Sequence, residues 1–397
     1  RIIKVGGSKM TSVESLQKKI PLNNQIGLIG LLLCAFSSPL IMPLNIIAIS
    51  EKFISATNGQ IGLIATFETL FISISSIILS RLVNKLNRKK IFFVASLFVM
   101  TGNFLTIFAP ELNYVILSRM ISGLGSGAIV ATVVATIARG SNGQMTFALL
   151  NSGVGVMGIL LPFLLPIIIA SNGMEGAYSL HFLISLLTFL FLYLIRLEEG
   201  ENDEINSMES YKGISGWIAM FGTSLVFLAH AGIFSFSAKI GAGIGISVTQ
   251  IGYIFMSGGV LTIFGPLIAG FIGQRFGSLA PCLLLIIVLL VTGVIIPNVT
   301  SPIIFYMAVP ICGMIPMIMT PFYLGAMAKL DPTGGLAAAH PAFSTMGGAA
   351  GPVVMGYISD WQGFTGIGWV VLMTILIGIP WISIALMEDD KKKSLFI

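Results

Sequence analysis

The chain has 397 residues, of which 55% are hydrophobic and only 9% are charged, and its formal net charge is +5. Soluble globular proteins carry about 25% charged residues, so this composition excludes a soluble protein and indicates one that is integral to a membrane. The apolar runs are about 20 residues long, which predicts spanning helices rather than the shorter strands of a membrane barrel. In such a chain the positive charge is a topology signal, so we expect contact with the lipid bilayer and no nucleic-acid partner.

Hydropathy predicts twelve spanning helices, whose boundaries are defined to within a few residues. Several contain Pro or Gly, which membrane helices tolerate where neighbouring helices satisfy the freed backbone groups. In chain order the spans cover residues 25–49, 59–80, 89–109, 112–138, 145–170, 177–196, 213–237, 247–273, 278–296, 301–326, 334–358 and 364–387.

The placement of Lys and Arg predicts which side of the membrane each connection faces. With the N-terminal segment 1–24 and the tail 388–397 in the cytoplasm, only Lys52 and Lys239 of the 21 Lys and Arg residues fall outside, and Arg119 falls within a span. Cytoplasmic connections are enriched in Lys and Arg, so this bias supports an even number of spans. We expect a bacterial inner-membrane protein without a cleavable signal peptide.

An acidic connection, residues 197–212, divides the spans six and six. It follows a first bundle, 25–196, and precedes a second, 213–387. We expect a flexible cytoplasmic linker, and a regulatory docking segment is the alternative. The acids in this region are Glu198, Glu199, Glu201, Asp203, Glu204 and Glu209.

The two halves carry matching short basic connections. "SRLVNKLNRKK", Ser80 to Lys90, follows the second span, and "GFIGQRFGS", Gly270 to Ser278, follows the eighth. Halves of nearly equal length with matching loops suggest an internal duplication, as in transporters that are built from repeats.

The layout and two motifs resemble the major facilitator superfamily of secondary transporters, most of all its twelve-span drug and metabolite group. Span four carries "RMISGLGSG", which begins at Arg119 and resembles the family's Arg-x-x-x-Gly-x-Gly-x-Gly pattern. The loop after span two is a degenerate form of the family's Gly-x-Leu-x-Asp-Arg-x-Gly-Arg-Arg pattern, in which Asn84 replaces the acid. The resemblance implies an all-α fold of two pseudo-symmetric six-helix bundles, and transport by alternating access.

Ionisable groups within spans are the best pointers to function, because each is costly in hydrocarbon. Glu68 lies about nine residues into span two and Arg119 about seven into span four, so a rise of about 1.5 Å per residue places them at similar depth. We therefore expect an ion pair, in which Glu68 binds the coupling proton. The alternative is a static pair that fixes helix packing. The resemblance favours the first interpretation, since it links the span-four arginine to proton transfer.

Span seven carries a candidate substrate-binding wall. Phe227 and Phe234 lie near His230 at helical spacings, which is typical either of bundle packing or of one binding face. The resemblance implies that span seven lines the central cavity, so we expect these three side chains to contact the substrate.

Six further polar residues within spans are candidate substrate contacts. Two serines share the helical face of Arg119, where they either line the cavity or bond back to carbonyls. A histidine near the start of span eleven either contacts the substrate or packs against a carbonyl. The six are Asn45, Ser122, Ser126, Asn151, Tyr306 and His340. We place His181, at the start of span six, close to the membrane interface.

The connection after span two is the candidate cytoplasmic gate. In the family its acid meets the N-terminus of span eleven, where the helix dipole favours negative charge. Here Asn84 has no charge, so the latch is either weaker or supplied by Asp331, which we expect to cap span eleven. Arg88 and, in the second copy, Arg275 complete the candidate gate.

These features favour a monomeric transporter that uses protons as the coupling ion and needs no cofactor or metal. The 27 Phe and 19 Met residues suit a small amphipathic organic solute, which favours export by proton antiport. Proton symport of a small metabolite is the alternative, and a non-transporting receptor or scaffold is a less favoured one. A membrane enzyme would need clustered ligands or a nucleophile with its base. The scattered ionisable residues do not offer these, and Cys34, Cys282 and Cys312 lack metal-ligand spacing.

Overall fold

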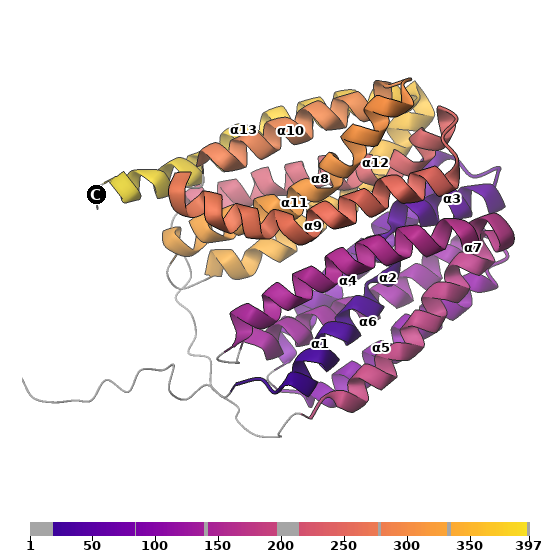
Figure 1. The fold of residues 1–397 in the computed structure, drawn as a ribbon, viewed down its shortest axis with the longest axis horizontal. Coiled ribbons are helices and arrows are strands. Elements are labelled where there is room, and N and C mark those ends of the chain that lie inside the picture. Colours follow the sequence, from indigo (N-terminus) through magenta and orange to yellow (C-terminus); the bar gives the residue numbers. More distant parts are fainter. Residues whose placement is uncertain are drawn as a thin grey trace, which may run out of the picture.

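A computed structural model describes residues 19–83, 85–138, 142–196, 214–276, 279–331 and 335–394. The secondary structure in these ranges is helical, as predicted, and it forms two bundles that lie side by side (Figure 1). The first bundle comprises α1 (Leu22–Ala35), α2 (Ser37–Leu40), α3 (Met42–Lys52), α4 (Asn58–Leu82), α5 (Arg88–Ile107), α6 (Leu112–Ala138) and α7 (Gly143–Leu194). The second comprises α8 (Ile214–Gly243), α9 (Val248–Phe276), α10 (Leu279–Asn298), α11 (Pro302–Leu330), α12 (Gly335–Gln362) and α13 (Phe364–Ser394).

The first predicted span is broken into three helices, whereas the hydropathy pattern indicated one. The backbone leaves helical geometry at Phe36 and again at Ile41. Pro39 and Pro43 lie in this stretch, and a proline both lacks an amide donor and clashes with the preceding turn. The break exposes backbone oxygens, and the Asn45 side chain donates to one of them, the oxygen of Ser38, at 3.1 Å.

Predicted spans five and six run together as α7, with a sharp turn between them. The turn is made at Gly173, whose backbone has φ 56° and ψ −144°. Residues with a β-carbon rarely adopt this conformation, and glycine does so readily. The second arm of α7 therefore starts earlier than the predicted boundary at residue 177.

Nine of the helices in the described ranges are long and apolar enough to cross a membrane, by length and composition. They are α4 to α11 and α13. Helix α7 contains two predicted spans, five and six. Span one corresponds to α1 to α3, and span eleven corresponds to α12. Each of the twelve predicted spans therefore falls on helical residues. The predicted all-α fold is confirmed.

Glycines of span four bring α6 close to two neighbours. A β-carbon added at Gly123 would lie 2.4 Å from the backbone oxygen of Glu68, and one at Gly127 would lie 2.2 Å from that of Ile72. On the other side, one at Gly125 would lie 2.4 Å from the backbone oxygen of Ala95 on α5. The motif thus holds α6 against α4 and α5 at backbone contact, which sets the separation of Arg119 from Glu68.

The two bundles meet at one end of the molecule, which we call the joined end: α4 begins there and α12 ends there. A β-carbon at Gly62 would lie 2.3 Å from the backbone oxygen of Pro352, and the amide of Val353 donates to Thr66 Oγ1 at 3.1 Å. At the opposite, basic end, α4 ends and α5 begins. Figure 1 shows the ribbons of the two bundles converging at the joined end, near the labels α3 and α12, and diverging toward the basic end.

Candidate functional site

The intramembrane acid and base predicted as a pair lie in contact. Glu68 Oε1 is 3.4 Å from Arg119 Nη1, and both side chains have 0% of their surface exposed. The pair joins α4 to α6 at the level where Gly123 allows backbone contact. Removing two opposite charges from water is costly, and their mutual attraction offsets this cost only if further hydrogen bonds satisfy both groups. The hydrogen-bonding groups around the pair therefore decide what it can do.

Arg119 makes several hydrogen bonds in addition to its contact with Glu68. Its Nε and Nη2 donate to Thr106 Oγ1 at 3.1 and 2.7 Å, and its Nη1 donates to Asn103 Oδ1 at 3.0 Å and to Ser38 Oγ at 3.3 Å. The ring of Tyr178 lies 4.7 Å from the guanidinium carbon. This arrangement uses the planar fork of arginine, which a lysine side chain does not reproduce.

The network continues through neutral side chains to α3 and α7. Asn103 Nδ2 donates to the backbone oxygen of His181 at 3.3 Å. The imidazole of His181 contacts Asn45 Oδ1 through Nε2 at 3.1 Å and Ser37 Oγ through Nδ1 at 3.2 Å. Helices α2 to α7 thus contribute to one buried polar cluster within the first bundle, with Glu68 and Arg119 as its charged members.

One oxygen of Glu68 stands apart from this cluster. Its Oε2 is buried and has no hydrogen-bond partner among the described residues. A buried, ionised carboxylate normally accepts hydrogen bonds at both oxygens, because a buried unpaired acceptor costs about 1–3 kcal/mol. A proton on this oxygen would lower that cost, since it removes the charge that needs solvation.

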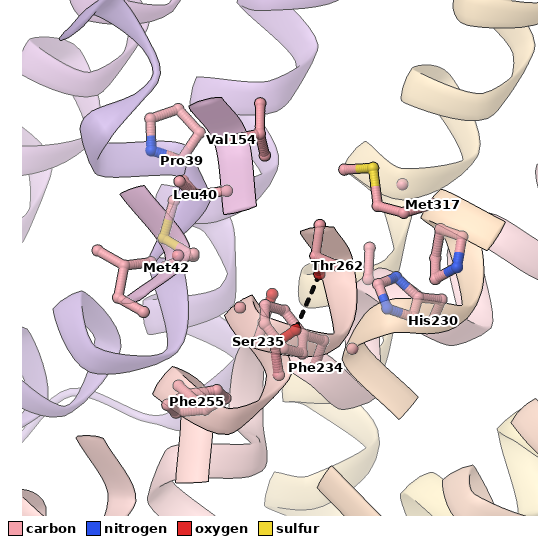
Figure 2. A pocket seen from close by; sticks show the side chains of 18 of the residues that line it. Pro39, Leu40, Met42, Val154, His230, Phe234, Ser235, Phe255, Thr262 and Met317 are labelled. Carbon is pink, nitrogen blue, oxygen red and sulfur yellow. Dashed lines mark hydrogen bonds between the residues drawn. The ribbon is translucent and has the colours of Figure 1, made fainter. Parts of the chain in front are cut away.

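A cavity of about 330 Å³ lies between the two bundles. The first bundle contributes an apolar wall that includes Pro39, Leu40, Met42 and Val154, which Figure 2 shows on the side opposite His230. The second bundle contributes α8, α9, α11 and α12. The volume is within the range of pockets for small organic ligands, which is about 300–1,000 Å³.

The polar groups of this cavity come mostly from the second bundle. Among its described lining residues, the polar side chains are Thr69, His230, Ser235 and Thr262, and none is Asp, Glu, Lys or Arg. His230 stacks on Phe234 with ring centroids 5.5 Å apart and an interplanar angle of 14°. Figure 2 shows Ser235, Thr262 and His230 grouped near Phe234.

The buried pair lies directly behind the cavity wall. Thr69 lines the cavity while its neighbour Glu68 belongs to the polar cluster, and Pro39 lines the cavity while its neighbour Ser38 contacts Arg119. Two segments of backbone therefore have one residue facing the solute and the next facing the ion pair. A shift of either segment would therefore move both the cavity wall and the groups around the ion pair.

The structure brings some of the predicted substrate contacts together at the cavity and not others. His230 and Phe234 line it. Phe227 is half-buried, with its ring 6.1 Å from that of His340. His340 is 4% exposed and its ring also lies 5.1 Å from that of Tyr323, so these two side chains pack behind the wall.

The other predicted contacts lie away from the cavity. Ser126 Oγ donates to the backbone oxygen of Ala35 at 2.8 Å, so it fastens α6 to α1. Ser122 is buried against Gly102 of α5. Asn45 belongs to the polar cluster described above. Asn151 is exposed, and so is Tyr306, with 38% of its surface accessible.

The candidate gate is described only in part. Asp331 Oδ2 accepts a hydrogen bond from the amide of Leu336 at 2.9 Å, so it caps the start of α12 as expected. Arg88 Nη1 donates to Thr136 Oγ1 at 3.4 Å, between α5 and α6. Asn84 and the side chain of Arg275 lie outside the described residues.

Sequence reasoning missed several members of the polar cluster. Asn103 and Thr106 are spaced three apart in an otherwise apolar span, which is a signal that they share a helical face. His181, which we placed close to the membrane interface, has 0% of its surface exposed, and its burial in the cluster was not foreseen. It lies on the second arm of α7, which starts at the Gly173 turn. Tyr178, which is also 0% exposed, lies on the same arm of α7.

A joint between the bundles was not predicted at all. Asp360, near the end of α12, accepts hydrogen bonds from the backbone amides of Asn58 and Gly59 at 2.7 and 2.8 Å. Lys239 of α8 donates from Nζ to Asn58 Oδ1. These contacts place an acid of the second bundle on the first turn of a helix of the first bundle.

Comparison with known proteins agrees with this architecture. The model of the Major Facilitator Superfamily matches residues 27–345, which is more than half of the chain. No match to a curated protein sequence was found. The nucleoside transporter NupG superposes with a TM-score of 0.72 at 12% identity, and the alignment covers 93% of this chain and 100% of that one.

Two other solved structures are similar over nearly their whole length. The peptide transporter POT superposes with a TM-score of 0.71 at 12% identity, covering 94% of this chain and 97% of that one. A bacterial homologue of the human lysosomal transporter Spinster, in an inward-facing and unoccupied conformation, gives 0.67 at 13% identity, with coverage of 94% and 98%. At such identities the likeness establishes the fold.

Proposed function

Since the chain belongs to the major facilitator superfamily, we propose that it is a proton-coupled secondary transporter, which exports a small amphipathic organic solute by proton antiport. The observation that carries this proposal is the buried contact of Glu68 with Arg119, which leaves Glu68 Oε2 without a partner. Structural pairs usually satisfy all their hydrogen-bonding groups, so an open acceptor favours a site that exchanges a proton.

Protonation of Glu68 would change the electrostatic interactions of Arg119. When Glu68 is ionised, its charge balances the guanidinium. When Glu68 takes up a proton, Arg119 keeps the neutral oxygens of Thr106 and Asn103 and loses its counter-charge. The balance of forces on α4 then changes, and Thr69 on the same helix faces the solute.

Alternating access would follow from motion of one bundle relative to the other. The contacts of Asn58 with Asp360 and of Thr66 with Val353 close the joined end. The basic end carries exposed Arg81, Lys89 and Lys90, which favours a cytoplasmic location. With this orientation we propose an inward-facing form of a monomeric transporter in a bacterial inner membrane, and the closed joined end supports it.

The lining of the cavity supports an amphipathic solute. Most of it is apolar, and His230, Ser235 and Thr262 offer a small polar region. A sugar would need many more hydrogen-bonding partners, because each buried hydroxyl without one costs free energy. Proton symport of a small metabolite remains the second candidate, and it would use the same pair.

The test is solute-induced proton movement in proteoliposomes that enclose a pH-sensitive dye. When a panel of amphipathic solutes is added outside, antiport makes the interior more alkaline, because protons leave as solute enters. Symport acidifies the interior instead. The Glu68→Gln variant should show neither change. Glu111→Gln, which changes an exposed acid in the connection between α5 and α6, serves as the matched control and should behave as the native chain.

A response that survives intact in Glu68→Gln would exclude the proton role of this residue. A chain that moves no solute of the panel and no protons would favour the receptor or scaffold alternative.

A further inference from the structure

The cavity wall carries no charged side chain among its described lining residues, although the buried pair lies only one residue behind it. A charged solute would leave water and gain no counter-charge here. Transfer of an isolated ion into a low-dielectric site is very unfavourable. Arg119 is also unavailable as a partner, since it has 0% exposure and its donors are committed to the polar cluster.

The polar groups that the second bundle offers can each accept a hydrogen bond from a solute. Thr262 Oγ1 already donates to the backbone oxygen of Gly258 at 2.9 Å, so its lone pairs are what it presents to a ligand. Ser235 lines the cavity and makes no hydrogen bond with another described residue. Both hydroxyls belong to residues that line the same cavity as His230, and Figure 2 labels all three.

His230 adds a nitrogen that lacks a partner. Its Nε2 is buried and makes no hydrogen bond with any described residue. The ring itself lines the cavity, and the terminal torsion of a histidine is broad, so a small turn presents this nitrogen to a solute. A solute hydroxyl or amide proton would satisfy it, and would recover part of the free energy that an orphaned buried acceptor costs.

We propose that the cavity selects uncharged amphipathic solutes that carry a hydrogen-bond donor, with the donor directed to His230, Ser235 and Thr262 of the second bundle. The apolar body of the solute lies against Pro39, Leu40 and Met42 of the first bundle. This inference rests on the proposed function for its biological meaning. It concerns binding, however, and can be tested without transport.

The test is equilibrium binding to the purified full chain with four matched probes. They share a biphenyl body and differ in one group: 4-biphenylmethanol has a donor and no charge, its methyl ether has no donor, biphenylmethylamine is a cation and biphenyl-4-carboxylate is an anion. The alcohol should bind at least about tenfold more tightly than either ion, because only the ions lose solvation without a counter-charge.

Variants then locate the donor. His230→Phe, which keeps a ring against Phe234, should weaken binding of the alcohol about fivefold and leave that of the ether unchanged. Ser235→Ala is a second variant with the same expected loss for the alcohol. Ser237→Ala is the matched control, because Ser237 does not line the cavity and donates to the backbone oxygen of Phe234 at 2.6 Å.

The proposal is overturned if either ion binds as tightly as the alcohol, if His230→Phe weakens alcohol and ether equally, or if none of the four probes binds. Binding of the alcohol with no proton movement in proteoliposomes would instead remove the proposed function and leave the binding preference standing. Proton movement driven only by charged solutes would leave the proposed function standing and remove the binding preference.

Discussion

The carboxylate of Asp360, near the end of α12, accepts a hydrogen bond from the backbone amide of Asn58, the first residue of α4, at 2.7 Å. Its second oxygen accepts from Gly59 at 2.8 Å. An acid at a helix N-terminus is stabilised both by the free amides and by the helix dipole. Because the two helices belong to different bundles, this contact stabilises the form in which the joined end is closed.

Replacement of this acid should open the joined end. Asp360→Asn keeps the size of the side chain and loses the charge, which we expect to cost about 1.4 kcal/mol, or about a tenfold shift of the equilibrium. The measurement is labelling of a cysteine placed at Thr69 by an impermeant maleimide added at the joined end. Glu175→Gln is the control, because Glu175 pairs with Lys52 within the first bundle. Equal labelling rates in both variants would contradict the role of Asp360.

A second prediction concerns the close approach of the bundles at Gly62. A β-carbon there would lie 2.3 Å from the backbone oxygen of Pro352, which cannot move as a side-chain tip can. Gly62→Ala should therefore destabilise the chain by about 1–3 kcal/mol, as overpacking does. Thermal unfolding in detergent measures the loss. Gly243→Ala, at the same end but with nothing within 4 Å of the added carbon, should cause no comparable loss.

Arg119 should stabilise the first bundle through its planar fork as well as through its charge. Arg119→Lys keeps the positive charge but cannot hold Thr106, Asn103 and Glu68 together, since lysine lacks the planar fork. The loss of charged hydrogen bonds should cost about 2 kcal/mol or more, measured by thermal unfolding in detergent. Glu68→Gln leaves the bonds of Arg119 to α5 in place but removes the counter-charge of a buried guanidinium, which should cost about 3 kcal/mol. If Arg119→Lys unfolds at the temperature of the native chain, the bonds to α5 do not carry the stability assigned to them.

An uncharged solute exchanged for a proton also predicts charge movement. Each cycle would transfer the charge of the proton alone, whereas exchange of a monovalent cation for one proton transfers none. Rapid addition of 4-biphenylmethanol to proteoliposomes on a capacitive electrode should give a current, with outward positive charge for antiport and inward for symport. The current should be absent in Glu68→Gln and present in Glu111→Gln. A native chain that moves protons in response to this alcohol without any current would contradict transport of an uncharged solute.

The sequence alone could place Glu68 and Arg119 at one depth, because a helix rises by a fixed amount per residue and the spans of a membrane protein are easy to find. The spacing of the glycines in span four also predicts close packing of that helix, but does not say which neighbours it packs against. The sequence did not reveal which way either side chain points. Helical rotation depends on the packing of neighbours, and here Gly123 against the backbone of Glu68 decides it.

The polar cluster around the pair shows where sequence reasoning ends. Asn103, His181 and Asn45 come from three separate spans, and each alone is a polar residue in an apolar run. Their hydrogen bonds depend on the break at Phe36 and Ile41 and on the turn at Gly173, neither of which changes the hydropathy profile.

What the sequence determined by itself is the membrane class, the spans and the presence of an acid and a base within them, because the cost of burying charge and backbone in lipid acts on each segment separately. Only the tertiary structure decided that Asn45 and Ser126 belong to packing within the first bundle, that His230 and Ser235 face a shared cavity, and that Asp360 joins the two halves. Those relationships arise between segments far apart in the chain, and they depend on helix rotation and on close backbone approach, which local composition does not encode.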